Sequence, residues 1–173
     1  MHMRADYIVH ESEHWIINHH LASRLPGYLV FGSRAQVDSL ADLPAEALAE
    51  MGLLMSKVQQ AMDQELAPKW LYIGRFGHAP GLPLHFHFIP VYDWVEALFW
   101  RDERYRALQQ FGSMEQALSQ TDGAELTLFV WREFGESQTP PQISGRSVAE
   151  VIAALRASIK QAIVGEACVD CLV

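Results

Sequence analysis

Two histidines, His85 and His87, are the residues of this sequence whose type and spacing best suit chemistry. They alternate with apolar residues through the segment 84–89, which is followed by Pro90. A period of two predicts a strand on which both imidazoles project from one face, while the residues between them face a core. Near neutral pH an imidazole can act as a nucleophile, a proton carrier or a metal ligand. We therefore expect this strand to carry the reactive groups.

The segment before this strand, residues 77–83, is rich in glycine and proline, which predicts a loop. It contains His78 and Gly81, and Arg75 lies just before it. Backbone N–H groups in such a loop can bind oxyanions. The loop and the strand together therefore predict a site for an anion or a phosphate group. Arg75 either faces this loop or is exposed to solvent.

The composition predicts one globular domain, residues 1–173, because half of the residues are hydrophobic and a fifth are charged. The formal net charge of -8 argues against binding a polymeric nucleic acid, whose backbone requires clustered Lys and Arg. No apolar run approaches the roughly 20 residues needed to span a bilayer. The first residues also lack the apolar core of a signal peptide. We expect a cytoplasmic protein without a membrane partner.

Hydrophobic periodicity predicts both strands and helices along the chain. Besides the histidine strand, strands are expected at residues 7–10, 15–18, 28–32, 70–76 and 125–131. Helices are expected at residues 44–66, 94–110, 114–118 and 147–164. The second half, residues 93–164, should extend the same domain, because its single strand cannot satisfy its own backbone groups and its helices need a partner surface. We predict that this strand joins or covers an edge of the sheet.

Four segments resemble, in order and spacing, those of a histidine triad (HIT) protein: residues 27–31, 39–43, 72–74 and 85–90. The resemblance covers about residues 7–92 and is nearest to the diadenosine polyphosphate hydrolase-like members. It implies an α+β HIT-like fold, with an antiparallel sheet and a long helix, here followed by a C-terminal α/β extension. It also implies a nucleotide or dinucleotide phosphate substrate, cleavage or transfer at the α-phosphate, and no metal or other cofactor. A homodimer formed through the long helix and the strand from Trp70 is expected.

In this family the strand carries three histidines at alternate positions, and the second is the nucleophile. Aligned on Pro90, His87 takes the third position, His85 the second and Pro83 the first. The resemblance implies that His85 attacks the α-phosphorus and that water resolves the nucleotidyl-histidine. His87 would donate to a phosphate oxygen or assist the leaving group. The first histidine of the family helps to orient the nucleophile, and His78 is the candidate to take its place.

The nucleoside is expected among the early strands, over the apolar surface of Trp15, Ile16 and Ile17. Asn18 resembles the polar residue that reaches the ribose in this family. Asn18, His78, Gly81 and Arg75 are therefore the expected substrate-binding residues. Arg34 resembles a basic residue that often precedes the long helix, although a solubilising role fits it equally.

Two other functions remain open at this point. The protein could bind nucleotides with weak or lost catalysis, which Pro83 favours. It could instead bind a metal through His78, His85 and His87. In the second half, three aromatic residues are candidates to wall the nucleotide site and so to determine substrate choice: Trp94, Phe99 and Trp100.

Two further pairs have a plain structural interpretation. His19 and His20 are expected at a solvated strand end rather than in a metal site. Cys168 and Cys171 have the C-x-x-C spacing of some zinc and redox sites. No other cysteine is present to complete a zinc site, so an unanchored tail is the expected state of this pair.

Overall fold

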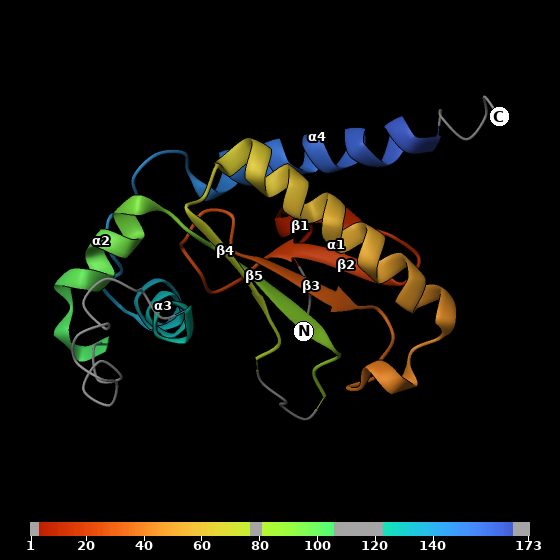
Figure 1. The fold of residues 1–173 in the computed structure, drawn as a ribbon, viewed down its shortest axis with the longest axis horizontal. Coiled ribbons are helices and arrows are strands. Elements are labelled where there is room, and N and C mark those ends of the chain that lie inside the picture. The colour runs from red at the N-terminus through yellow and green to blue at the C-terminus, as the bar shows by residue number, and fades with distance from the viewer. Residues whose placement is uncertain (1–3, 77–80, 106–122, 168–173) are drawn as a thin grey trace, which may run out of the picture.

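The computed structural model describes residues 4–76, 81–105 and 123–167. A five-stranded antiparallel sheet with the order β1-β2-β3-β5-β4 lies at its centre (Figure 1). The strands are β1 (Ile8–Glu11), β2 (Trp15–His19), β3 (Leu29–Ser33), β4 (Trp70–Gly74) and β5 (His85–Val91). The predicted α+β class is confirmed, and the histidine strand β5 lies inside the sheet between β3 and β4.

Strand β5 continues through Pro90 to Val91, although the sequence pattern suggested that it ends at the proline. Its pairing with β3 extends only from His85 to Phe88. Beyond that point β5 pairs with β4 alone, where Pro90 lies opposite Leu71. A residue without an N–H is tolerated there because the strand has a neighbour on one side only.

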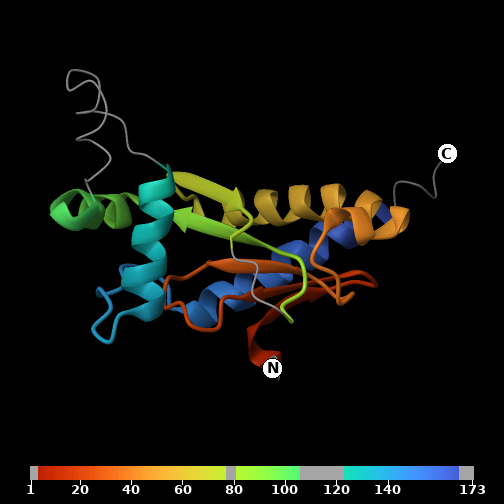
Figure 2. The same cartoon turned by 90° about the horizontal axis from the view of Figure 1, so that it is seen from below.

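Two long helices, α1 (Ala45–Leu66) and α4 (Val148–Ala167), lie side by side and cover one face of the sheet (Figures 1 and 2). Pro44 occupies the N-cap of α1. A capping box begins α4: Ser147 Oγ accepts from the Glu150 N–H at 3.3 Å, and the Glu150 carboxylate accepts from the Ser147 N–H at 2.8 Å. The core between helices and sheet includes the buried residues Trp15, Ile17, Phe31, Val58, Phe88 and Leu155.

In the part of the chain that the structure describes, the opposite face of the sheet is covered at one end, by α2 (Asp93–Arg101) and α3 (Gly123–Val130). A π-helical turn, Trp131–Glu136, continues α3. A second buried cluster joins Ile89 and Val91 of β5 to aromatic residues of these helices, among them Phe99, Phe129 and Phe134. Short 3-10 helices at Ala5–Tyr7, Leu40–Asp42 and Glu103–Tyr105 complete the described elements.

The predicted strand at residues 125–131 is wrong, because this segment is helical. Leu126, Phe129 and Val130 are buried, whereas Leu128 is 47% exposed. A strand would place residues 126, 128 and 130 on the same face, but burial at positions i, i+3 and i+4 is the pattern of a helix. Periodicity alone does not distinguish a short apolar run in a strand from one in a buried helix.

The other predictions for the second half have mixed outcomes. The helix expected at 94–110 ends at Arg101 as α2, and residues 106–122, with the helix expected at 114–118, lie outside the described part. α4 contacts α1 and β1, and α3 contacts β5, so both helices pack on the sheet formed by the first half. The assignment of residues 1–173 to one domain stays a prediction. Within the described residues, no helix has the length and apolarity to cross a bilayer.

Candidate functional site

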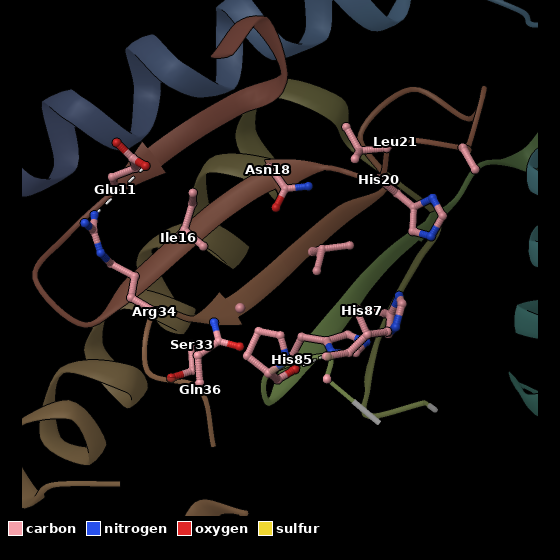
Figure 3. Close-up of a pocket in the computed structure, with 16 residues that line it drawn as sticks. Glu11, Ile16, Asn18, His20, Leu21, Ser33, Arg34, Gln36, His85 and His87 are labelled. Carbon is pink, nitrogen blue, oxygen red and sulfur yellow. Dashed lines mark hydrogen bonds and ion pairs between the residues drawn. The ribbon is translucent and has the colours of Figure 1, made fainter. Parts of the chain in front are cut away.

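A cavity of about 620 Å³ lies on the face of the sheet opposite α1 and α4 (Figure 3). The strand register explains its floor. Ile16, Gly32 and His85 form one row across β2, β3 and β5, and Asn18, Val30 and His87 form the next row. Gly32 carries no side chain, so the space between Ile16 and His85 stays open. The two predicted catalytic histidines therefore project into one cavity, as period-two alternation requires.

His85 is half-buried, and its Nδ1 atom lies 2.8 Å from the backbone carbonyl oxygen of Pro83. A carbonyl oxygen can only accept a hydrogen bond, so Nδ1 carries the proton in the neutral ring. The lone pair is then on Nε2. An imidazole held in this tautomer presents a nucleophilic nitrogen without the help of another side chain.

His87 is only 4% exposed, and its ring lies edge-on to that of His85 with 5.0 Å between the centroids. Its Nδ1 atom is 3.0 Å from the Tyr28 hydroxyl, and its Nε2 atom is buried with no hydrogen-bond partner among the described residues. Burial lowers the pKa of His87 to about 4, with further lowering by His85 and His20 and a small opposing effect of the Phe76 backbone. His87 is therefore neutral at physiological pH.

Two of the four predicted substrate-binding residues line the cavity, Asn18 and Gly81. The Asn18 amide nitrogen donates to the His19 carbonyl at 2.8 Å. Gly81 has a φ of 83°, a left-handed conformation that favours glycine. Arg75 is not brought to the cavity, because its guanidinium donates to the backbone carbonyl of Asp38. His78 lies outside the described residues.

The expectation that His19 and His20 are a solvated strand end is wrong. His19 is fully buried on the core face, where its Nε2 and Nδ1 atoms contact the Leu25 and His20 carbonyls at 2.9 and 3.1 Å. Burial lowers the pKa of His19 to about 4. His20 is half-buried and lines the cavity. It follows Asn18 by two positions. Continuing the alternation of the predicted strand 15–18 to residue 20 would therefore have placed His20 on the cavity face.

Several aromatic and apolar predictions also change. Of the three residues expected to form an apolar surface for the nucleoside, only Ile16 lines the cavity, whereas Trp15 and Ile17 are fully buried on the other face. The candidate wall residues of the second half do not line it within the chain, namely Trp94, Phe99 and Trp100. Tyr28, which the sequence did not single out, reaches His87 instead.

The end of the cavity away from His20 and His87 is charged (Figure 3). There the exposed Arg34 guanidinium lies 4.0 Å from the Glu11 carboxylate and donates to the Ser12 carbonyl at 3.3 Å. Arg34 is the one Lys or Arg among the described residues that line the cavity. The other end of the cavity, which holds His20, His85 and His87 and is called the reactive end below, has no Lys or Arg among the described lining residues.

The described residues contain no group of three or more His, Cys, Asp and Glu that could hold a metal ion. The predicted metal-binding alternative used His78, and the C-x-x-C pair consists of Cys168 and Cys171. All three residues lie outside the described part of the chain.

No protein-family model matches this sequence, and no curated protein matches it significantly. Solved structures do resemble it. One is a hypothetical histidine triad nucleotide-binding protein from Sulfolobus tokodaii strain7, with a TM-score of 0.52, 14% identity, and coverage of 90% of this chain and 84% of that chain. A zinc-bound histidine triad family protein from Mycobacterium smegmatis has a TM-score of 0.52 and 13% identity, and the match covers 92% of this chain and 87% of that chain.

A uridylyltransferase structure has a TM-score of 0.53 and 14% identity, and the match covers 91% of this chain but 42% of that one. At these identities the likeness establishes the fold. The chain therefore has the α+β fold of histidine triad proteins, which confirms the fold expected from the resemblance.

Proposed function

We propose that this protein is a nucleotide hydrolase or nucleotidyl transferase that acts at the α-phosphate through a nucleotidyl-histidine on His85. The observation that carries the proposal is the hydrogen bond between His85 Nδ1 and the Pro83 carbonyl. It fixes the proton on Nδ1 and the lone pair on Nε2, in a ring that lines a cavity of a size typical of small-molecule sites.

In the first step of this reaction, the Nε2 lone pair forms a bond to the α-phosphorus, and the bond from phosphorus to the leaving group breaks. The leaving group departs with the electron pair of that bond. The imidazole becomes positively charged, and its Nδ1–H remains hydrogen-bonded to the Pro83 carbonyl oxygen. In the second step water attacks the phosphorus and releases a proton to the solvent. The bond from phosphorus to Nε2 breaks, its electron pair returns to the nitrogen, and His85 leaves as the neutral imidazole. In a transferase a second acceptor replaces the water.

Pro83 occupies the position of the first histidine in the family motif, and this departure does not remove the contact that orients His85. The contact uses the backbone carbonyl of residue 83, which a proline possesses like any other residue. We propose that His87 is the second member of the site. Tyr28 holds its ring, which lies edge-on to the His85 ring and limits how that ring can turn.

The same cavity suggests how a nucleotide would lie. With its α-phosphate at His85, the nucleoside would extend over Ile16, Val30 and Gly32 toward Arg34, with Asn18 beside the ribose. The Gly81 backbone also lines this cavity. We propose dinucleoside polyphosphates as the preferred substrates within this class. The cavity is open to solvent, so the second nucleoside of a bound substrate could extend out of it beyond the phosphate end.

A homodimer is part of the proposal. Trp70 and Ile73 on the edge strand β4 and Leu53 on α1 are apolar and between 40% and 69% exposed. Burying such residues against a second copy would stabilise the assembly. Light scattering should give twice the chain mass of 19.5 kDa at micromolar concentration, and a monomer mass at all concentrations would contradict it.

The proposed function is tested by incubating the purified protein with nucleoside triphosphates, dinucleoside polyphosphates and nucleoside phosphoramidates that carry a labelled α-phosphate. We expect turnover of at least one class and a transient acid-labile label on the protein, because a phosphorus–nitrogen bond to histidine is acid-labile. Binding of these ligands without turnover or label would instead support a nucleotide-binding protein without catalysis.

A further inference from the structure

Among the described residues at the reactive end of the cavity, His20 is the one chemically active side chain that the mechanism above leaves unused. It follows the last residue of β2, and its backbone N–H donates to the Tyr28 carbonyl at 2.8 Å. Its ring stacks on the Tyr28 ring, with 4.6 Å between the centroids and an interplanar angle of 29°. The backbone and the ring of His20 are therefore both held against Tyr28.

The tautomer of His20 follows from its neighbour Ser23. The Ser23 backbone N–H is shared between His20 Nδ1 and the His20 carbonyl oxygen, each at 3.2 Å. A peptide N–H can only donate, so Nδ1 must hold a lone pair and the proton of the neutral ring must be on Nε2. Among the described residues, Nε2 of His20 has no hydrogen-bond partner. Burial lowers the pKa of His20, and His85 lowers it further, so the ring is neutral and keeps this single N–H.

His20 and His87 differ in what they can offer a ligand. Neither nitrogen of His87 is open to a ligand, because its Nδ1 atom contacts the Tyr28 hydroxyl and its Nε2 atom is buried. The His20 ring lies 6.0 Å from the His87 ring and lines the same cavity (Figure 3), and its Nε2–H has no partner among the described residues. The donor expected of His87 from the sequence is thus better supplied by His20.

We propose that His20 is a third imidazole of this site, whose Nε2–H donates a hydrogen bond to a non-bridging oxygen of the α-phosphate as His85 attacks. This inference rests on the proposed function. Charge on these oxygens must be stabilised by neutral donors, since the one cationic side chain among the described lining residues, Arg34, lies at the other end. Removing one donor of this kind from an enzyme typically lowers kcat by about 10²–10³-fold.

A matched pair of variants isolates this donor. His20→Gln and His20→Met introduce side chains of the same length, and both remove the stacking on Tyr28, but only Gln carries an N–H. We expect His20→Met to lower kcat by about 10²-fold with KM changed by less than about threefold, and His20→Gln to recover about tenfold of that loss. His14→Gln, outside the cavity, is the control for losing a histidine and should stay within about twofold of the wild type.

A stereochemical measurement makes the test independent of how much protein is folded. The two diastereomers of a nucleoside 5′-(α-thio)triphosphate replace one or the other non-bridging oxygen by sulfur, which is a poor acceptor. The ratio of their rates should change by about tenfold or more between the wild type and His20→Met, because one diastereomer has already lost the contact. A merely structural role of His20 would leave this ratio unchanged.

Different outcomes contradict the proposed function and the role of His20. If the wild type turns over none of the substrates, or if His85→Asn is as active as the wild type, the proposed function is overturned together with the role of His20. If turnover depends on His85 but the Gln and Met variants have equal kcat and the diastereomer ratio does not change, only the role of His20 is overturned.

Discussion

Four residues on one face of β5 have two different surroundings. Ile89 and Val91 are buried in the aromatic cluster formed with α2 and α3, whereas His85 and His87 border the cavity. The strand and the face are the same, so the difference comes from α3, which packs on β5 from Ile89 onward. No residue of the described C-terminal region lines the cavity. The described part of that region therefore covers Ile89 and Val91 and supplies no side chain to the cavity.

Tyr28 lies at the boundary between these two surroundings. Its ring belongs to the aromatic cluster, and its hydroxyl reaches His87 in the cavity wall. Burial raises the pKa of the Tyr28 phenol, so it keeps its proton and can donate to His87 Nδ1. The packed end of the face thus fixes the orientation of a ring at the reactive end.

The largest effect is expected at the reactive end of this face. His85→Asn should lower turnover by about 10⁴-fold or more, since it removes the attacking nitrogen, and should leave nucleotide affinity within about threefold. Single-turnover kinetics and calorimetric titration with a nucleoside monophosphate measure the two quantities. Wild-type turnover in this variant would exclude His85 as the nucleophile.

At the packed end of the face, Phe129→Ala should lower the free energy of unfolding by about 3–5 kcal/mol, because it leaves a cavity in the aromatic cluster. Leu128→Ala, one residue earlier on the same helix, is the matched control and should cost about 0.5 kcal/mol, since Leu128 is largely exposed. Urea denaturation measures both. Equal costs at the two positions would contradict the helical arrangement of this segment.

This contrast also shows what the sequence could reveal. Alternation placed His85 and His87 on one face correctly, because a strand inside a sheet has two distinct faces. The segment 125–131 was misassigned because its apolar residues serve a helix buried on most sides, for which alternation carries no information. The contact between Tyr28 and His87 had no local signal in the sequence. Tyr28 and His87 are 59 residues apart in sequence and meet only through the β3–β5 pairing.

The third prediction concerns pH and distinguishes His87 from its apolar neighbours on the same face. Its pKa is lowered to about 4 in the folded state from 6.5, so the unfolded chain binds more protons between these values. The stabilisation from His87 is therefore complete above about pH 6.5 and is lost as the pH falls toward 4. Between pH 8 and pH 5 this histidine alone should account for about 2 kcal/mol of lost stability.

The pH dependence can be assigned by comparing wild type with His87→Gln. Urea denaturation at both pH values should show a loss about 2 kcal/mol smaller in the variant, whatever its absolute stability. His19, whose pKa is also lowered to about 4, should contribute a similar loss in both proteins and so cancel. Identical losses in the two proteins would mean that folding does not lower the pKa of His87.

The smallest effect is expected at the boundary itself. Tyr28→Phe keeps the ring in the aromatic cluster and its stacking with His20, but it removes the hydroxyl that contacts His87 Nδ1. The free energy of unfolding should fall by about 1–2 kcal/mol, because the Nδ1 atom of His87 is left buried without its hydrogen-bond partner. If this hydrogen bond orients the ring beside His85, kcat should fall by a few-fold while KM stays constant. A variant with reduced stability and an unchanged kcat would show that Tyr28 supports the fold only, and that the two ends of this face act independently.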